Sequence, residues 1–371
     1  YNTKMKNIPL FKVHMPRSVK DPLLETLFSG FIGQGPKVDE FENKLGNYFQ
    51  NDQVLTVNSG TSALQLALRL ANVGHGDEVI STAMTCPATN MPIMAAGAKI
   101  VWADVDPVSG LISPEEIKKK ITAKTKAIIM VHFGGIPCDI DAINKIASEH
   151  GIQTIEDAAH AFGSEYKGKK IGNHSDFVMF SLQAIKHITT VDGGLLFCKS
   201  KSDYERGKLL RWYGIDRESP RKDFRCEENI IEYGYKFHMN DIAATIGIEQ
   251  LKYADSLIDK HIKNAAKYDD ELSDVQAISL IPRNDNSVSA SWLYTLHLNN
   301  RDEFMSYMSE KGIATSKVHE RNDLHDAFID FADNLDGVSK FCKTQVSIPV
   351  GWWLDKEDSD YIINNIKAFA G

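Results

Sequence analysis

Short apolar runs alternate with segments of helical periodicity through the first 200 residues. The candidate buried strands lie at 54–57, 78–81, 100–105, 127–132, 154–157, 177–180 and 195–197. Candidate helices lie at 22–27, 37–49, 63–71, 88–96 and 141–148. This alternation is typical of a mostly parallel sheet covered by helices on both faces. The predicted fold class is therefore α/β.

The pattern changes after residue 200. A charged helix is predicted at 203–212, a polar stretch at 214–230, and a long helix with a kink from 242 to about 272. Short strands at 291–296 and 346–349 and helices at 302–311 and 356–369 then predict a smaller α+β unit. We expect a large α/β domain with an N-terminal arm over 1–250, and a small domain over 251–371.

Composition narrows the classes of function. The chain has 371 residues, with 43% hydrophobic and 25% charged content, which suits two domains around one active site. A net charge of −8 disfavours a nucleic-acid partner. No apolar run approaches the roughly 20 residues that cross a bilayer, and the chain begins with polar residues. We therefore expect a cytoplasmic protein with no membrane partner.

Cysteine and histidine spacing gives no sign of a metal site. The five cysteines are scattered, and none forms a CxxC pair. The twelve histidines include no His-x3-His pair that would place two ligands on one face of a helix. We expect free thiols and neither a metal nor a disulfide framework. The cysteines are Cys86, Cys138, Cys198, Cys226 and Cys342.

Polar side chains stand where the predicted strands end. They are Asn58, Thr85, His132, Asp157 and Ser181. Ligands collect at the carboxyl ends of the strands in open parallel sheets. This shared position is stronger evidence for a binding site than any single motif.

Lys186 stands in a polar segment between two apolar strands. Desolvation lowers the pKa of an amine, and a lysine in this setting can form a Schiff base, although most lysines are solvated surface residues. Asp157 ends an apolar run. The turn at 58–62 opens a helix whose first N–H groups attract an anion, or are simply capped by its hydroxyl side chains. An amine, a carboxylate and an anion site are what pyridoxal phosphate requires.

These segments resemble one family of pyridoxal phosphate enzymes. Matching pieces occur in family order over nearly the whole chain: QGP at 34–36, SGTSAL at 59–64, GDEVI at 76–80, EDAAH at 156–160, Ser181 with Lys186, TT at 189–190, GG at 193–194, and AA at 243–244 with Gly247. The chain is similar to the DegT/DnrJ/StrS sugar aminotransferases. The resemblance implies the fold-type I transferase fold and a homodimer whose active sites are shared between subunits.

The resemblance also implies roles for site residues. Lys186 would bind pyridoxal phosphate as a Schiff base and carry protons, while the cofactor cycles through pyridoxamine phosphate. Asp157 would pair with the protonated pyridine nitrogen, and His160 would lie against the cofactor ring. The phosphate would be held by Gly60, Thr61, Ser62 and Ser181.

Three departures from the family pattern matter, and the mildest is Val191-Asp192 in place of the common Gly-Glu. Relatives carry Phe, Tyr or Trp after the threonine that matches Thr85, where this chain has Cys86. The sequence therefore leaves undecided which side chain stacks on the cofactor ring. Relatives have Asn and Arg in the loop in which Lys236 and His238 stand. Lys236 would still offer a cation to the phosphate from the partner subunit.

The expected reaction moves an amino group from glutamate to a nucleotide-linked keto-deoxysugar, with a 4-keto-6-deoxyhexose as the expected sugar. Cations at 217–225, which are Arg217, Arg221, Lys222 and Arg225, either meet the diphosphate or form a solvated loop beside Glu227 and Glu228. Further candidate substrate contacts are His187, His319, Arg321 and His325, of which the last three are more simply explained as ordinary loop residues.

Two alternatives to an aminotransferase stay open. Some relatives replace the lysine with histidine and become sugar dehydratases. Ser181 and the threonine pair at 189–190 set the register, and in that register His187 is one residue too late for this role. The second alternative is a regulator that binds a ligand without turnover. Retained Lys186 and Asp157 argue against it, because a sensor needs neither.

Overall fold

The computed structural model describes residues 6–220 and 229–371. The helices are α1 (Lys20–Phe28), α2 (Pro36–Phe49), α3 (Gly60–Leu70), α4 (Pro87–Ala95), α5 (Pro114–Lys120), α6 (Ile140–His150), α7 (Lys201–Leu210), α8 (Asp241–Leu251), α9 (Ala254–Leu272), α10 (Arg301–Glu310), α11 (Asp336–Thr344) and α12 (Lys356–Ala370). The longer strands are β1 (Val54–Val57), β2 (Glu78–Ser81), β3 (Lys99–Trp102), β4 (Thr125–Val131), β5 (Gln153–Asp157), β8 (Phe177–Ser181), β9 (Gly194–Cys198), β12 (Tyr294–His297) and β13 (Gln345–Ile348). The short strands are β6 (Glu165–Tyr166), β7 (Lys169–Lys170), β10 (Ser279–Leu280) and β11 (Ser287–Val288).

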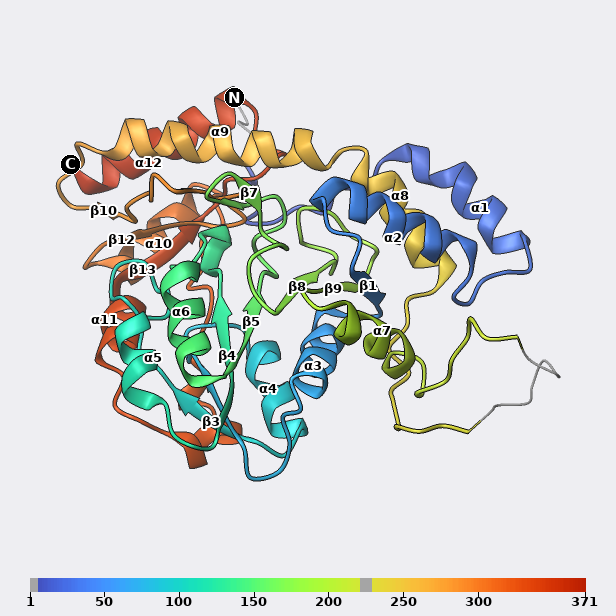
Figure 1. Cartoon of the computed structure of the whole chain (residues 1–371). Coiled ribbons are helices and arrows are strands. Elements are labelled where there is room, and N and C mark those ends of the chain that lie inside the picture. Colours follow the sequence, from blue (N-terminus) through green and yellow to red (C-terminus); the bar gives the residue numbers. More distant parts are fainter. Residues whose placement is uncertain (1–5, 221–228) are drawn as a thin grey trace.

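A seven-stranded mixed sheet forms the centre, in the order β1-β9-β8-β5-β4-β2-β3. Neighbouring strands from β8 to β3 run parallel, while β9 is antiparallel to both β8 and β1. The α/β class with a mostly parallel sheet is therefore confirmed. The carboxyl ends of β1, β8, β5, β4 and β2 all point to one edge of the sheet, and loops gather there (Figure 1).

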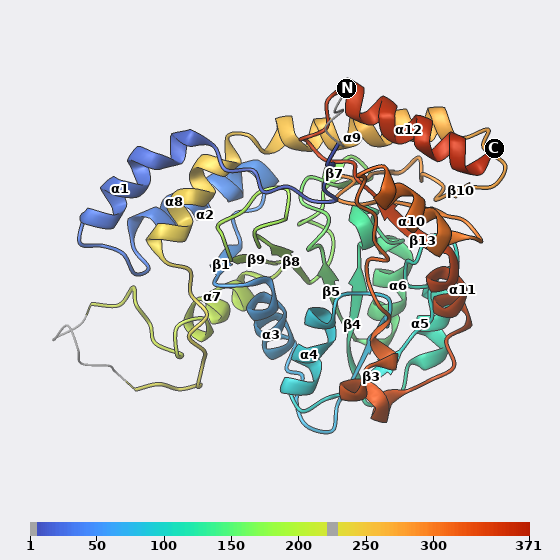
Figure 2. The same ribbon diagram turned by 180° about the vertical axis from the view of Figure 1, so that it is seen from behind.

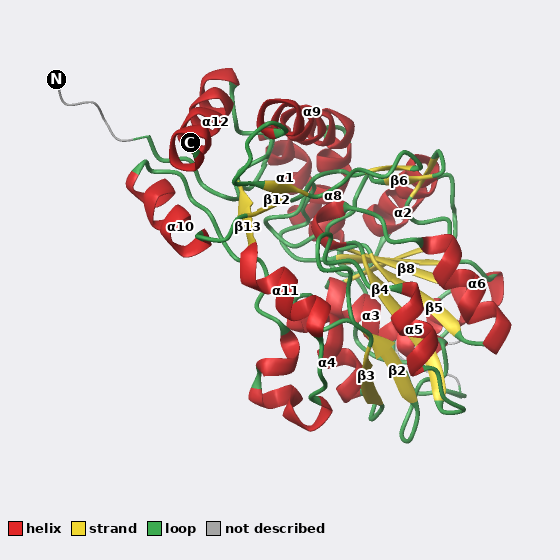
Figure 3. Cartoon of the chain, turned by 90° about the vertical axis from the view of Figure 1, so that its left-hand side faces the viewer, coloured by secondary structure: helices red, strands yellow, loops and turns green. Residues whose placement is uncertain are grey.

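Both faces of the sheet are buried. Ala127 and Ile129 of β4 join one apolar cluster, and the alternate residues Ile128 and Met130 join another. Successive side chains of a strand point to opposite faces, so the two clusters lie on the two sides of the sheet. One cluster includes side chains of α3 and α4, and the other includes side chains of α2, α6 and α8. Figure 3 shows α4 on one side of the strands and α6 on the other.

A second, three-stranded sheet of order β10-β12-β13 packs near α9 and α12 (Figure 1). The N-terminal segment runs from α1 to this side of the molecule (Figure 2). There the N–H of Ile8 donates to the carbonyl of Gly312 (2.8 Å), and Ile8 is buried in the same core. The division of the chain at residue 250 stays a prediction. Within the described residues, no helix is long and apolar enough to span a membrane.

The structure corrects several predicted elements. β3 ends at Trp102, before the predicted end at 105, and the strand predicted at 291–296 is Tyr294–His297. α5 and α11 were not predicted. α5 buries only Ile117, so it has no apolar stripe that periodicity could reveal. The helix predicted at 203–212 is Lys201–Leu210, and the kinked long helix divides into α8 and α9.

Candidate active site

Lys186 lies in the connection between β8 and β9. A main-chain hydrogen bond joins the two ends of this connection. The N–H of Leu182 donates to the carbonyl of Gly193 (2.9 Å). The Lys186 side chain is partly buried, and burial lowers the pKa of its amino group to about 8, against the opposing charge of Asp157. More of this amine is therefore unprotonated near neutral pH than in a surface lysine, as nucleophilic chemistry requires.

Asp157 stands at the end of β5, with 4% of its surface exposed. The hydroxyl of Thr89 donates to its Oδ2 (2.7 Å), and the N–H of Ala159 donates to its Oδ1 (3.1 Å). Burial raises the pKa of the carboxyl group, while these two hydrogen bonds oppose the rise. Thr85 extends the chain of hydroxyls, with its Oγ1 2.8 Å from that of Thr89. Each carboxyl oxygen thus has a fixed donor.

His160 presents a flat, uncharged ring in the same region. The N–H of Gly134 donates to its Nδ1 (3.3 Å). The ring stacks on Trp292 at a centroid distance of 4.0 Å and on His319 at 5.6 Å. Burial lowers the pKa of His160 well below its ordinary value and that of His319 to about 4. Both imidazoles are therefore neutral at physiological pH.

The turn before α3 is an N-cap. Oγ of Ser59 accepts a hydrogen bond from the N–H of Ser62 (3.0 Å), and the hydroxyl of Ser62 donates to Oδ1 of Asn58 (2.6 Å). The capping interpretation of this turn therefore holds. Ser62, one of the predicted phosphate contacts, is engaged within the turn in this structure.

The start of α3 also meets Ser181, at the end of β8. A Cβ on Gly60 would lie 3.0 Å from the Cβ of Ser181, so the helix approaches this closely only because residue 60 is glycine. The first N–H groups of a helix have no partner within it, and its dipole favours an anion. The N–H groups of Gly60 and Thr61 and the hydroxyl of Ser181 therefore form the candidate anion site.

Two other predicted cofactor contacts lie around these groups. Cys86 is the residue before α4 and is partly buried. Its thiol is one of the groups near the Lys186 amine. The side chain of Lys236 is exposed, and its carbonyl accepts a hydrogen bond from Nδ2 of Asn58 (3.3 Å). The main chain at Lys236 thus lies beside the turn that leads into α3.

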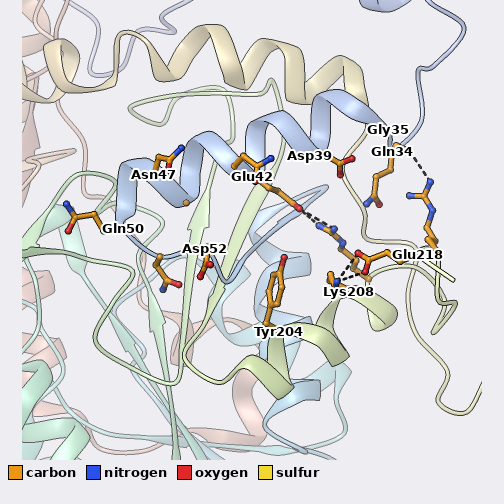
Figure 4. A pocket seen from close by; sticks show the side chains of 15 residues that line it. Gln34, Gly35, Asp39, Glu42, Asn47, Gln50, Asp52, Tyr204, Lys208 and Glu218 are labelled. Atoms are coloured by element: carbon orange, nitrogen blue, oxygen red, sulfur yellow. Dashed lines mark hydrogen bonds and ion pairs between the residues drawn. The ribbon is translucent and has the colours of Figure 1, made fainter.

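Arg217 lies apart from Lys186. It borders a polar cavity of about 880 Å³ between α2, α7 and the segment that follows α7 (Figure 4). Its guanidinium donates to the carbonyl of Gln34 (3.0 Å) and lies over the ring of Trp212 (4.4 Å). Lys186 does not line this cavity. Arg221, Lys222, Arg225, Cys226, Glu227 and Glu228 lie outside the described residues.

His187 is buried in the core. Its Nε2 lies 2.9 Å from the carbonyl oxygen of Ala290, and its ring packs on His261 at a centroid distance of 4.7 Å. Burial lowers its pKa well below the ordinary value. The structure gives His187 a packing role behind Lys186.

The three candidate substrate contacts in the second half of the chain have different surroundings. His319 joins the site through its stack on His160. Arg321 is paired with both carboxylate oxygens of Asp323 (2.8 and 2.6 Å), so its charge is used locally. The ring of His325 packs beside Phe328 at 6.5 Å.

Asn322 joins this loop to the predicted site. It is fully buried, its Nδ2 donates to the carbonyl of Thr85 (2.7 Å), and its N–H donates to that of Ala83 (2.8 Å). The loop that carries His319 is therefore fixed against the segment before α4.

Sequence reasoning missed Trp292 and Thr89. The apolar pattern places Trp292 in a strand, but it lies just before β12, with Lys186 Nζ 3.7 Å from its ring centroid. Thr89 is 68 residues from Asp157, within an ordinary helical pattern. Neither residue has a local signal that distinguishes it from a packing residue.

Comparison with known proteins gives one consistent result. A family model, the DegT/DnrJ/EryC1/StrS aminotransferase family, matches residues 17–367. The chain is 31% identical to the spore coat polysaccharide biosynthesis protein SpsC of Bacillus subtilis, over 92% of each chain. Among solved structures, it resembles AtS13 of Actinomadura melliaura (39% identity, 98% of each chain, TM-score 0.94). It also resembles the sugar aminotransferase CalS13 of Micromonospora echinospora (36% identity, 97% of this chain and 99% of that chain, TM-score 0.93).

Proposed function

The chain belongs to the DegT/DnrJ/EryC1/StrS aminotransferase family, and we propose that it transfers an amino group from glutamate to a nucleotide-linked keto-deoxysugar, a 4-keto-6-deoxyhexose, in the synthesis of a surface polysaccharide. It is a sugar aminotransferase that depends on pyridoxal phosphate. The sugar, its nucleotide and the amino donor are the proposed part of this assignment.

One observation carries the proposal. The amine of Lys186, the carboxyl group of Asp157 and the start of α3 come from three distant parts of the chain and meet at one edge of the sheet. Each is unusual by itself: an amine of lowered pKa, a buried carboxyl group with two donors, and a helix start closed against a serine. An amine, a carboxylate and an anion site in one place match the three polar ends of pyridoxal phosphate.

The residues present fit this cofactor. The close approach of Gly60 to Ser181 leaves the N–H groups at the start of α3 and a hydroxyl group at one place, which suits a phosphate. Asp157 lies deeper and suits a protonated ring nitrogen. Lys186 suits the aldehyde, because a buried amine is more readily unprotonated. When bound, pyridoxal phosphate acts as an electron sink and carries the amino group between donor and acceptor.

Each residue of the site then has a separate role. The start of α3 and Ser181 bind and orient the phosphate end. Asp157, held by Thr89 and the main chain, keeps a negative charge where a ring nitrogen needs a partner. The amino group of Lys186 takes up and returns a proton, for which a pKa near the working pH is the best value. His160 is a neutral, flat contact that excludes water.

The geometry favours amino transfer over dehydration. The dehydratase alternative requires a histidine in the place of the reactive lysine. Here Lys186 interacts electrostatically with Asp157, whereas Nε2 of His187 is directed at the carbonyl of Ala290. His187 is therefore poorly placed to replace the lysine.

Support for the substrate comes from the family and from charge. SpsC is named for polysaccharide biosynthesis, and CalS13 is called a sugar aminotransferase. Arg217 is exposed at the border of a polar cavity, and an arginine suits a diphosphate. We keep Arg217 as the candidate contact for the nucleotide, supplied across a subunit interface.

We further propose a homodimer. Apolar side chains of α1 and the following loop are exposed, with 80% of Phe28 and 67% of Phe31 accessible. Ile32 continues this surface to an apolar hollow that includes Val191 and Ile246. A second copy of the chain would bury this surface next to the connection that carries Lys186. Light scattering tests the mass, and Phe28→Glu with Phe31→Glu should yield a monomer.

The first experiment is a visible absorption spectrum of the purified chain, before and after addition of excess glutamate. We expect a band from bound pyridoxal phosphate that bleaches with glutamate and returns with the correct keto-sugar. Lys186→Ala should lose the band and the amino transfer. A band unchanged by glutamate would contradict the proposed donor. No band after reconstitution would contradict the enzyme assignment and favour a ligand-binding regulator.

A further inference from the structure

Trp292 contacts the amino group of Lys186. Nζ lies 3.7 Å from the centroid of the indole ring, which is well inside the range of a cation–π interaction. Trp292 itself has 4% of its surface exposed. An ammonium group over a desolvated indole is stabilised more strongly than one over a ring at the surface.

The same indole is tied to two neighbours of this amine. Its Nε1–H donates to the carbonyl of Ile185 (3.0 Å), the residue before Lys186. Its ring stacks on His160 at 4.0 Å and 20° and on Phe11 at 4.7 Å and 22°. The Trp292 side chain thus contacts the main chain before Lys186, the amino group of Lys186, and His160, which is predicted to lie against the cofactor ring.

Buried polar groups fix the turn that carries Trp292. Nε2 of His187 lies 2.9 Å from the carbonyl oxygen of Ala290, and Nδ1 of His261 lies 3.0 Å from that of Ser291. The N–H of Ala290 donates to Oγ of Ser164 (2.9 Å). The indole therefore has a fixed position against Lys186, and His187 contributes to the site through this turn.

We propose that Trp292 is a positioning residue for Lys186. The indole N–H of Trp292 fixes the main chain at Ile185, and its ring face holds the free amino group of Lys186 beside His160. The inference rests on the proposed function and adds a residue to that same site. The alternative is that Trp292 only fills space in the core. These two roles differ in what they do to the protonation of Lys186.

Several other groups surround the amine and enter the design of the test. Asp157 favours its charged form and Cys86 lies near it, while the amine in turn lowers the pKa of His160, His187 and His319. All of them remain in the variants chosen below, so a changed titration of Lys186 reports on the indole.

The test measures acetylation of Lys186 against pH by peptide mass spectrometry, on the full chain without added cofactor. We expect a midpoint near pH 8 for the native chain. Trp292→Leu keeps the site apolar and removes the ring, so the ammonium form loses support and the midpoint should fall by about 0.5 to 1 pH unit. Trp292→Phe keeps a ring face and should stay nearer to the native midpoint.

Trp352 offers a matched control. Its Nε1 also donates to a main-chain carbonyl, that of Lys12 (3.2 Å), and the amine of Lys12 lies 5.6 Å from its ring centroid. Trp352→Leu should leave the Lys186 midpoint unchanged. A native midpoint in folded Trp292→Leu would overturn the proposal and leave Trp292 as a packing residue.

A second measurement needs no change at Trp292. Tryptophan emission of the native chain should change with pH as the amine over the indole titrates. Lys186→Met should remove this change, whereas Lys12→Met should retain it. Equal titrations of the native chain and Lys186→Met would overturn the proposal. Neither experiment uses a sugar or an amino donor, so a wrong substrate in the proposed function would leave both results interpretable.

Discussion

The hydroxyl group of Thr89 donates a hydrogen bond of 2.7 Å to Oδ2 of Asp157, across 68 residues of sequence. A buried carboxylate is stabilised by each donor it receives. Thr89→Val should therefore raise the pKa of Asp157 and weaken its hold on a protonated ring nitrogen. We expect kcat/KM to fall about tenfold, the effect of about 1.4 kcal/mol.

Thr89→Ser is the control for this change, because it keeps the hydroxyl group. It should retain most of the activity, and the acid limb of the pH–rate profile should move only in Thr89→Val. Equal losses in the two variants would show that packing, and not the hydrogen bond, matters at this position.

Asp157→Asn removes the negative charge and keeps the shape. We expect the visible band to remain and amino transfer to fall on the order of 100- to 1000-fold, as for loss of one preorganised electrostatic contact. Stopped-flow decay of the band with glutamate measures this step. Asp176→Asn is the control, since Asp176 accepts a hydrogen bond from the main chain at Thr154 (2.9 Å) away from Lys186. A native rate in Asp157→Asn would contradict its role.

Lys186→Met should stabilise the protein near neutral pH. The folded pKa of Lys186 is about 8, below the unfolded value of about 10.4, so folding disfavours its protonated form. The unfolded chain binds more protons between these values, and the cost of burying the ammonium is complete below pH 8. We expect a gain of about 1–2 kcal/mol at pH 7, reduced from the full shift by the partial exposure of the side chain.

The pH dependence separates this effect from better packing. The advantage of Lys186→Met in urea unfolding should shrink as the pH rises from 8 to about 10.4. An advantage that is constant over this range would show that the ammonium is not the cause.

Gly60→Ala should weaken binding of pyridoxal phosphate. The added Cβ would lie 3.0 Å from Cβ of Ser181 and 3.1 Å from Cε of Met179, so the start of α3 must move away from Ser181. Overpacking of this kind costs about 1–3 kcal/mol, and we expect the affinity to fall about tenfold or more. Titration of the visible band measures it.

Gly74→Ala is the matched control for that change. A Cβ at Gly74 has nothing within 4 Å and its backbone is not in the left-handed region. This variant should bind the cofactor as the native chain does. Native affinity in Gly60→Ala would contradict the anion site at α3.

The sequence determined the layered fold because its signal is local. The predicted strands at 54–57 (Val-Leu-Thr-Val) and 78–81 (Glu-Val-Ile-Ser) became β1 and β2 without change, since a strand buried on both faces is mainly apolar. Asp157 and the turn at 58–62 could also be named in advance, because each stands directly at the end of such a strand, and Lys186 because it lies in the polar connection between two of them.

Tertiary structure alone decided which other residues join them. Trp292 reaches Lys186 through a turn held by His187 and His261, and Thr89 reaches Asp157 across the sheet edge. Arg321, a candidate substrate contact from the sequence, is paired instead with Asp323. Contacts between distant segments depend on how helices and loops pack, and side-chain periodicity carries no information about that. The sequence therefore specifies where the strands end, while packing selects the side chains that meet there.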